Sequence, residues 1–329
     1  MNTLHHTLHL LALAAAMGAP LWAAGQDIHF SQQGENPILF NPAYTGFYEG
    51  TGRFGLLYRN QWATVSTPFQ TCALTGEMAL QRGRNSLSGT NIGLVATKDA
   101  AGSLNYGTLG ARLSLAHYFS MDRQGTSILS LGAEAGYATS GFDPSHASMG
   151  DPSEVFEKQQ VGYAVLGVGA AWFYQPSGEW QIKTGAALRN LNRPNISYLG
   201  LDDTYLEPLV NIYGRAEWRC WQSVSLLPTA IVQLQRQYHE VVYGMDVKWY
   251  ADGMTKHQVS LATGVAHRHA DAVTTHLTLE YDAFLMMFYY DANLSSLATA
   301  SHTIGAFEVG LVYRMVHDKG VRAIKCPVF

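Results

Sequence analysis

Apolar and polar residues alternate with a period of two along most of this chain. In residues 53–62, one parity holds Phe54, Leu56, Tyr58 and Trp62, and the other holds Arg53, Gly55, Arg59 and Gln61. The same pattern recurs in residues 127–139, 180–189 and 307–314. Because successive side chains of a strand point to opposite faces, each segment predicts a strand with one apolar and one polar face.

Extending this interpretation along the chain predicts about fourteen strands. They span residues 52–62, 69–79, 91–99, 104–118, 127–139, 162–174, 179–190, 208–219, 223–236, 240–250, 257–267, 273–281, 284–292 and 304–315. An even number of strands of about ten residues is typical of a single-chain transmembrane barrel. A soluble two-sheet sandwich shows the same alternation, so the period alone leaves both fold classes open.

The charges within the predicted strands favour the barrel. They fall mostly on the polar parity: Arg53, Arg59, Arg112, Glu134, Lys183, Arg189, Arg215, Glu217, Glu280, Glu308 and Arg314. A polar face in contact with bulk water usually carries many lysines, whereas arginine and glutamate of opposite sign can pair across an enclosed lumen. We therefore expect these charges to line the interior of a barrel that is partly closed.

Composition points the same way. Charged residues make up 14% of the chain, well below the roughly 25% of soluble proteins. The chain also holds 32 glycines and 18 tyrosines, which suits strands that meet lipid on one face. Its net charge of −4 provides no basic surface, so nucleic acid is not an expected partner.

Residues 1–25 predict a signal peptide. An apolar run extends from Leu8 to Ala24, and the small residues Ala23 and Gly25 fit a cleavage site that leaves Gln26 at the new N-terminus. No lysine or arginine precedes the run, which starts behind histidines instead. No later stretch reaches the ~18 consecutive apolar residues of a transmembrane helix. A closed barrel is then the available way to span a membrane, because each backbone amide in lipid needs a hydrogen-bond partner.

The predicted topology is an all-β, antiparallel, up-and-down barrel in residues 51–316, integral to the outer membrane. With both termini in the periplasm, residues 317–329 form a periplasmic tail, and the inner connections are mostly short turns. The outer loops are then 63–68, 100–103, 140–161, 191–207, 237–239, 268–272 and 293–303.

Residues 26–50 do not show the strand pattern. Asn36-Pro37 and Asn41-Pro42 predict turns, and the segment carries too many apolar residues for a free tail. We expect it at the periplasmic end of the barrel, either as a plug or as a docking element for a partner. The sequence leaves both roles open.

No residue pattern indicates a cofactor or a metal. His267 and His269 could share one strand face near His257 and His276, but no carboxylate or thiol with matching spacing completes a metal site. We interpret these histidines as loop and rim residues. The three cysteines, Cys72, Cys220 and Cys326, exclude a complete disulfide framework. A disulfide between Cys220 and Cys326 on the periplasmic side is a hypothesis.

The sequence also offers little for catalysis. The adjacent pairs Ser145-His146 and Ser301-His302 lie in predicted loops, and no G-x-S-x-G motif occurs. A barrel lipase or protease is therefore the least favoured alternative, and we expect a protein that is not an enzyme.

Motifs distributed over the whole mature chain resemble one known family. They read Gln26-Asp27-Ile28-His29-Phe30-Ser31-Gln32, Asn36-Pro37, Phe40-Asn41-Pro42-Ala43-Tyr44-Thr45-Gly46, Tyr58-Arg59-Asn60-Gln61-Trp62, Tyr290-Asp291, Asn293-Leu294-Ser295-Ser296-Leu297, Ser301-His302, Leu311-Val312-Tyr313-Arg314 and Lys325-Cys326-Pro327-Val328-Phe329. In order and spacing they resemble the PorP/SprF membrane proteins of the type IX secretion system. Residues 80–280 carry few signature residues.

The resemblance implies an integral outer-membrane protein of Bacteroidota without cofactor or catalytic residue. It implies partners among the periplasmic and outer-membrane secretion proteins and, in gliding relatives, the delivery or surface attachment of large adhesins. The leading hypothesis is a secretion component whose N-terminal segment or outer loops, chiefly 140–161 and 191–207, bind those partners. The main alternative is a general diffusion porin. Arg59 and Trp62 are expected to serve folding, with Arg59 paired in the lumen and Trp62 at the membrane interface.

Overall fold

The computed structural model describes residues 30–32, 34–48, 50–62, 67–82, 87–102, 104, 106–143, 159–198, 204–251, 257–294 and 303–315. Two short 3-10 helices, η1 (Pro37–Leu39) and η2 (Pro42–Tyr44), precede fourteen strands. The strands are β1 (Gly52–Gln61), β2 (Phe69–Arg82), β3 (Ser88–Ala101), β4 (Tyr106–Ser120), β5 (Ser127–Gly141), β6 (Gln160–Tyr174), β7 (Trp180–Arg189), β8 (Leu209–Trp221), β9 (Val224–Gln235), β10 (Tyr238–Tyr250), β11 (Val259–Arg268), β12 (Ala272–Tyr281), β13 (Phe284–Asn293) and β14 (Ile304–Met315).

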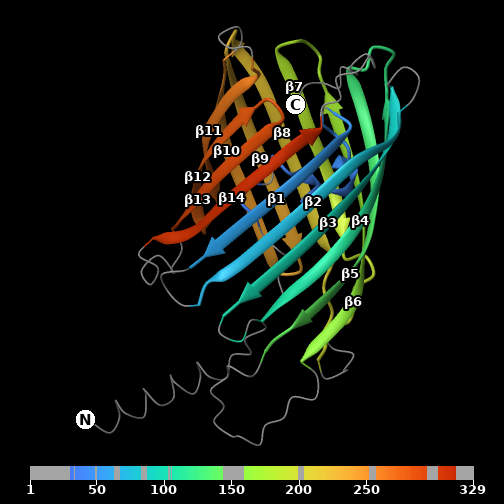
Figure 1. The fold of residues 1–329 in the computed structure, drawn as a ribbon, viewed down its shortest axis with the longest axis vertical. Coiled ribbons are helices and arrows are strands. Elements are labelled where there is room, and N and C mark those ends of the chain that lie inside the picture. Colours follow the sequence, from blue (N-terminus) through green and yellow to red (C-terminus); the bar gives the residue numbers. More distant parts are fainter. Residues whose placement is uncertain are drawn as a thin grey trace, which may run out of the picture.

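The strands form one closed barrel in which each strand pairs with its neighbours in sequence and β1 pairs with β14 (Figure 1). The closing pair is antiparallel and in register from Gly52 opposite Met315 to Gln61 opposite Ala306. Closure leaves no free sheet edge, which a chain in lipid requires. The fold class predicted from the period-two pattern is confirmed.

The wall places apolar side chains outside and polar ones inside. On β1, Phe54 and Leu56 are 51% and 56% exposed, whereas Arg53 and Arg59 are buried. This is the reverse of a soluble protein, and it matches a barrel whose outer face meets hydrocarbon and whose interior is polar. No helix within the described residues is long and apolar enough to cross a membrane.

The barrel has two distinct ends. The turn end is where β1 begins and β14 ends, and it carries the connections at 83–87, 121–126, 175–179, 222–223, 251–258 and 282–283. The loop end carries those at 62–68, 102–105, 142–159, 190–208, 236–237, 269–271 and 294–303. Longer connections gather at the loop end, which is the asymmetry of outer-membrane barrels.

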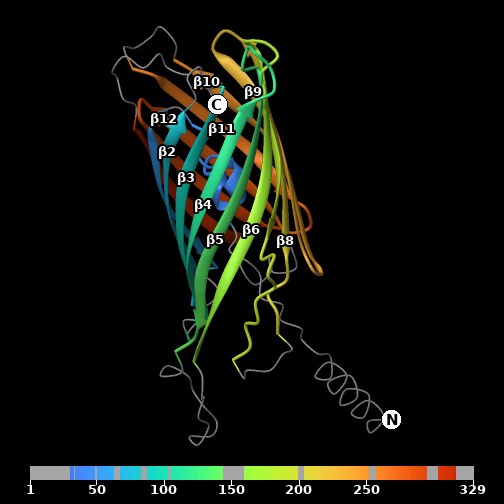
Figure 2. The same ribbon diagram turned by 90° about the vertical axis from the view of Figure 1, so that its right-hand side faces the viewer.

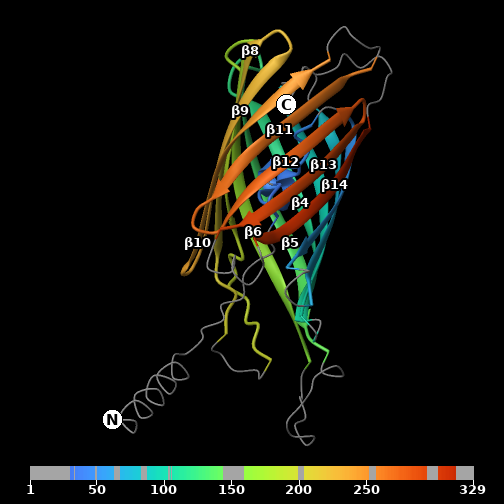
Figure 3. The ribbon, with the colours of Figure 1, turned by 90° about the vertical axis from the view of Figure 1, so that its left-hand side faces the viewer.

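Residues 30–48, here called the lumen segment, lie inside the barrel, where the blue ribbon runs behind the strands (Figure 2, Figure 3). Ser31 contacts strand residues near the loop end, and Tyr48 contacts Glu77 near the turn end. The segment therefore extends along the lumen, whereas the sequence placed it at the periplasmic end. Polar strand residues at several depths form hydrogen bonds with the lumen segment, and these bonds fix its course through the barrel.

Apolar packing also holds the lumen segment. Phe30, Ile38, Leu39 and Phe40 form one buried cluster with inward side chains of β1, β2 and β3. A second cluster joins Ala43, Tyr44 and Phe47 to inward residues of β4, β5, β6, β8, β9 and β10. The segment thus provides the apolar core that a polar lumen lacks.

Candidate functional site: a plugged lumen and its vestibule

Two Asn-Pro turns shape the lumen segment. Asn41 caps η2 because its side chain accepts a hydrogen bond from the amide of Ala43 at 2.8 Å, and Pro42 lacks the amide that would need a partner. The Asn41 amide also donates to the carbonyl oxygens of Ala170 and Ala186 at 3.1 and 3.3 Å. The cap therefore ties the segment to β6 and β7.

Ser31 is the centre of a charged cluster near the loop end. Its amide donates to Glu308 Oε1 at 2.7 Å, and its hydroxyl lies 2.8 Å from Asp291 Oδ2. The same hydroxyl oxygen lies 2.8 Å from Nη1 of Arg59 and 2.8 Å from Nη2 of Arg268. One serine thus joins two carboxylates and two guanidinium groups on β1, β11, β13 and β14.

The charges of this cluster also pair with each other. Arg59 Nη1 lies 3.1 Å from Asp291 Oδ2 and forms a second ion pair with Glu308. Arg268 contacts Asp291 at 3.4 Å and Glu240 at 3.4 Å. Buried ions of this kind are tolerated only when each has partners, because the lumen gives them little water.

A second anchor lies at the backbone of η1. The carbonyl oxygen of Leu39 accepts hydrogen bonds from Arg112 Nη2 at 3.3 Å and from Arg189 Nη1 at 3.4 Å. Glu134 lies between the two arginines, 3.5 Å from Arg112 and 3.0 Å from Arg189. The Glu134 carboxylate therefore pairs with both arginines, and both arginines satisfy a helix carbonyl that has no partner within the helix.

A third anchor holds the last turn of the lumen segment near the turn end. The Glu77 carboxylate accepts from the amide of Gly46 at 2.7 Å and pairs with Arg53 at 2.6 Å. The Tyr48 hydroxyl donates to the Glu77 carbonyl oxygen at 2.9 Å, and Arg53 stacks over the Tyr48 ring at 5.1 Å. Gly46 has a φ of +79°, a conformation that glycine adopts without strain.

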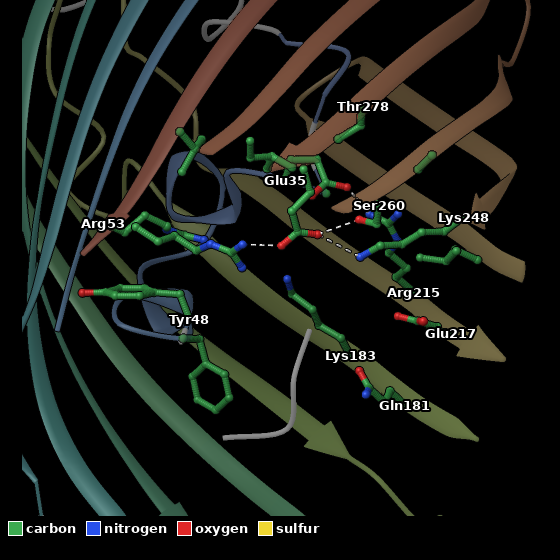
Figure 4. Close-up of a pocket in the computed structure, with 18 of the residues that line it drawn as sticks. Glu35, Tyr48, Arg53, Gln181, Lys183, Arg215, Glu217, Lys248, Ser260 and Thr278 are labelled. Atoms are coloured by element: carbon green, nitrogen blue, oxygen red, sulfur yellow. Dashed lines mark hydrogen bonds and ion pairs between the residues drawn. The ribbon is translucent and has the colours of Figure 1, made fainter. Parts of the chain in front are cut away.

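A cavity lies just inside the turn end, and we call it the vestibule. Its space not filled by atoms is about 970 Å³, which includes a part open to solvent. The lumen segment contributes Gly34, Glu35, Phe47 and Tyr48 to its lining, and the strands contribute ionic residues close to their turn-end termini (Figure 4). Those ionic residues are Arg53, Lys183, Arg215, Glu217, Lys248, Glu280 and Arg314.

Glu35 connects the lumen segment to the vestibule wall. Its Oε1 lies 2.8 Å from Nη1 of Arg215, and Arg215 also contacts Asp246 at 2.9 Å. His276 Nε2 lies 3.2 Å from the other oxygen of Asp246. Burial tends to raise the pKa of Glu35, but the nearby charges of Arg215, Lys248 and Lys183 outweigh it and lower this pKa to about 2. Glu35 is therefore ionised at every physiological pH.

The other carboxylates of the vestibule also have partners on the wall. Glu280 lies 3.3 Å from Lys248 Nζ, accepts from the Ser260 hydroxyl at 2.9 Å, and pairs with Arg314. Glu217 accepts a hydrogen bond from the hydroxyl of Tyr250. The carboxylates of the vestibule therefore all have partners.

The residues that the sequence singled out divide between the lumen segment and the loop end of β1. Phe30, Ser31, Asn36, Pro37, Asn41, Pro42, Tyr44 and Gly46 lie in the segment, and Arg59, Asn60, Gln61 and Trp62 lie at the end of β1. Asn36 Nδ2 donates to Thr75 Oγ1 at 3.0 Å, and Gln61 Oε1 accepts from Arg59 at 3.3 Å. Trp62 packs edge-on against Phe69, with ring centroids 5.0 Å apart.

Most of the charges expected in the lumen form ion pairs there, and these pairs fall into three separate places. Arg59 and Glu308 lie in the loop-end cluster, Arg112, Glu134 and Arg189 at η1, and Arg53, Glu280 and Arg314 towards the turn end. Sequence reasoning missed Glu35, Glu77, Asp246, Arg268 and Asp291. The last four lie on strands at inward-facing positions, so the period-two pattern could have identified them. Nothing in the sequence predicts that Glu35 pairs with Arg215.

His276 is not a rim residue. It lies in the middle of β12 with its side chain buried in the lumen, and its ring stacks on Tyr289 at 4.6 Å. His267 packs against Tyr243 and His269 near the loop end, and His257 pairs with Asp282 in a turn. No group of three or more metal-ligating side chains occurs among the residues that the structure describes.

The cysteines and the serine–histidine pairs are placed only in part. Cys72 is exposed on β2, and Cys220 is half-buried near the end of β8. Cys326, Ser145-His146 and Ser301-His302 lie outside the described residues. The disulfide between Cys220 and Cys326 stays a prediction, as does the signal peptide in residues 1–25.

Comparison with known proteins gives one sequence match and several structural ones. Residues 23–313 match the family described as type IX secretion system membrane protein PorP/SprF. No curated protein sequence matches the chain. Among solved structures, the chain resembles the CymD monoaromatic hydrocarbon channel, with 10% identity, a TM-score of 0.51, and coverage of 90% of this chain and 96% of that one.

A second structural match is the toluene transporter TbuX of Ralstonia pickettii. It shows 11% identity and a TM-score of 0.48, covering 85% of this chain and 93% of that one. At 10% identity the likeness to CymD concerns the fold alone, which is that of an outer-membrane barrel.

Proposed function

Because the chain belongs to the PorP/SprF family of type IX secretion system membrane proteins, we propose that it is a closed, non-enzymatic component of that system that holds partner proteins at the outer membrane. The partners are periplasmic and outer-membrane proteins of the machine and a large secreted adhesin, which it exports or anchors. In gliding species this adhesin would serve motility. Both chain termini face the periplasm in this proposal.

The observation that carries the proposal is the lumen segment. Ser31, Leu39 and Gly46 are bound to the wall at three depths, by the loop-end cluster, by Arg112 and Arg189, and by Glu77. A general diffusion porin needs an aqueous channel along its whole length. A lumen filled and bonded at three depths favours a scaffold instead.

Partner binding would use the loop end. In the loop-end connection at 190–208, Asn195 forms a β-bridge with Tyr205, and Arg193 pairs with Glu207 at 2.8 Å. Loop residues outside the membrane can vary without disturbing the wall, so they suit the recognition of a particular cargo. The regions 140–161 and 191–207 are therefore the proposed contact surfaces.

Gene deletion tests the proposal directly. Loss of the gene should abolish secretion or surface display of the cargo while general outer-membrane integrity stays normal. Crosslinking in intact cells, followed by mass spectrometry, should trap secretion proteins or an adhesin. Normal secretion and display in the deletion strain would refute the role.

Reconstitution separates the two non-enzymatic alternatives. The purified protein in a planar bilayer should give little stable conductance if the lumen segment closes it. A stable, long-lived open conductance of the wild-type protein would instead support the diffusion porin. Lipase and protease assays of the same preparation should show no activity above a heat-denatured control.

A further inference from the structure

One cation of the vestibule, Lys183, forms no direct ion pair with a carboxylate of the described residues. Lys183 extends from β7 into the cavity, where Figure 4 shows its amine directed towards the centre. Its Nζ lies 5.2 Å from the ring centroid of Tyr44 and 5.9 Å from that of Tyr213. Among the described residues it forms no hydrogen bond or ion pair.

The other four cations that line the vestibule each have an acidic partner. Arg53 pairs with Glu77, Arg215 with Glu35 and Asp246, and both Lys248 and Arg314 with Glu280. Lys183 is half-buried and has no such direct partner, so its amine is the vestibule cation that an incoming anion can pair with. The arginines are already engaged, so the vestibule offers one ammonium group rather than the guanidinium forks that suit phosphate.

The wall around Lys183 also has an apolar part. The same cavity is lined by the buried residues Phe47, Leu227 and Val312 and by Leu285. An ammonium group without a direct ion pair, next to apolar side chains, suits a ligand with one negative group and an apolar body. A fully hydrated inorganic anion would gain nothing from these side chains.

We propose that the vestibule binds a carboxylate with a short apolar body, with the carboxylate at Lys183 and the apolar part against Phe47 and Leu285. Such a group could come from a free monocarboxylic acid or from the C-terminus of a polypeptide that enters at the turn end. The site lies at the end opposite to the loops proposed for cargo contact, so the inference stands or falls independently of the secretion role.

Calorimetric titration of the full chain in micelles tests the site. Hexanoate and a tripeptide ending in leucine are the two charged probes, and hexanamide and the C-terminally amidated tripeptide are the matched neutral probes. Binding of hexanoate identifies a free acid, and binding of the tripeptide alone identifies a polypeptide end. Either charged probe should bind at least about tenfold more tightly than its neutral partner, as expected for loss of a charge-assisted hydrogen bond.

Variants place the binding at Lys183. Lys183→Met should weaken the charged probe at least about tenfold, whereas Lys98→Met, which removes an exposed lysine at the loop end of β3, should leave it unchanged. Equal binding by charged and neutral probes, no binding at all, or wild-type affinity in Lys183→Met would overturn the proposal. Equal binding of acetate and hexanoate would indicate an adventitious ion only.

A measurement on the wild-type protein covers the case in which Lys183→Met does not fold. Lys183 should be acetylated by a water-soluble reagent in the free protein and protected by saturating probe, as measured by mass spectrometry of its peptide. Lys98 should show the same acetylation with and without the probe. Unchanged acetylation of Lys183 at saturation would contradict the proposed site.

Discussion

The hydroxyl of Ser31 donates a hydrogen bond to Asp291 Oδ2 at 2.8 Å, and this contact joins positions 260 residues apart in the chain. Asp291 lies on β13, whereas Ser31 belongs to the lumen segment that precedes the first strand. The bond can therefore form only after the last strands are in place. The segment and the closed barrel consequently stabilise each other.

Removing the Ser31 hydroxyl should weaken that mutual stabilisation. Ser31→Ala leaves Asp291, Arg59 and Arg268 each without one hydrogen bond in a buried cluster. We expect the free energy of unfolding to fall by about 1–3 kcal/mol. Urea titration in micelles, followed by tryptophan fluorescence, measures it.

A surface serine is the control for this experiment. Ser177→Ala changes an exposed residue of the β6–β7 turn and should alter the free energy of unfolding by at most about 0.5 kcal/mol. If the two variants were equally stable, Ser31 would not anchor the lumen segment.

Arg59 should matter for folding more than for recognition. Arg59→Ala leaves Asp291 and Glu308 with fewer compensating charges at sites that are 2% exposed. Breaking a buried ion pair by removing one partner costs about 3–5 kcal/mol. A folded barrel changes its gel migration when it is heated until it unfolds. The variant should show this change at a lower temperature than the wild type.

An exposed ion pair provides the comparison for Arg59. Arg193 pairs with Glu207 but its side chain is 55% exposed, so Arg193→Ala should cost no more than about 1 kcal/mol. Arg59→Ala protein that migrates like the wild type yet fails to bind its secretion partners would assign Arg59 to recognition instead.

The wall was predictable because its determinants are local. A period of two places β1 at 52–62, and the structure has Gly52–Gln61. The prediction of 91–99 was shorter than β3, which runs from Ser88 to Ala101. Backbone pairing with β4 continues from Ser88 opposite Phe119 to Ala101 opposite Tyr106, and it needs no apolar alternation.

The contents of the lumen were much less predictable. Parity shows that Arg112 and Glu280 point inward, but it does not show at which depth a tilted strand places each side chain. The depth determines that Arg112 reaches the Leu39 carbonyl and that Glu280 lines the vestibule. The partners of Glu35 and Ser31 are set by tertiary contacts far along the chain, for which the sequence carries no local signal.

The tight turn at Gly46 gives a test of how closely the lumen segment fits. A Cβ atom at Gly46 would collide with Cγ and Cβ of Asn91, a side chain that is 1% exposed. Gly46→Ala should lower the free energy of unfolding by about 1–2 kcal/mol because of its positive φ, and by about 1–3 kcal/mol more because of the overlap. Urea unfolding of the purified variant measures the sum.

Gly102 separates the two contributions. It has a similar φ of +68°, and a Cβ atom there would meet nothing within 4 Å. Gly102→Ala should therefore show only the backbone cost. Equal losses in the two variants would mean that the segment is loosely held near Asn91.

The ion pair between Glu35 and Arg215 predicts a dependence on pH that Glu35→Gln should remove. The pKa of Glu35 is lowered from 4.5 to about 2 in the folded protein, so the folded state binds its proton less readily than the unfolded state does. Its contribution to stability is then fully present above about pH 4.5 and is lost as the pH falls towards 2. The difference in unfolding free energy between wild type and Glu35→Gln should be constant from pH 7 to 5 and should shrink below that.

Glu179→Gln, which removes an exposed carboxylate from the β6–β7 turn, is the control for general charge effects. A wild-type advantage that stayed constant down to pH 2.5 would show that the charge of Glu35 does not hold the lumen segment against Arg215.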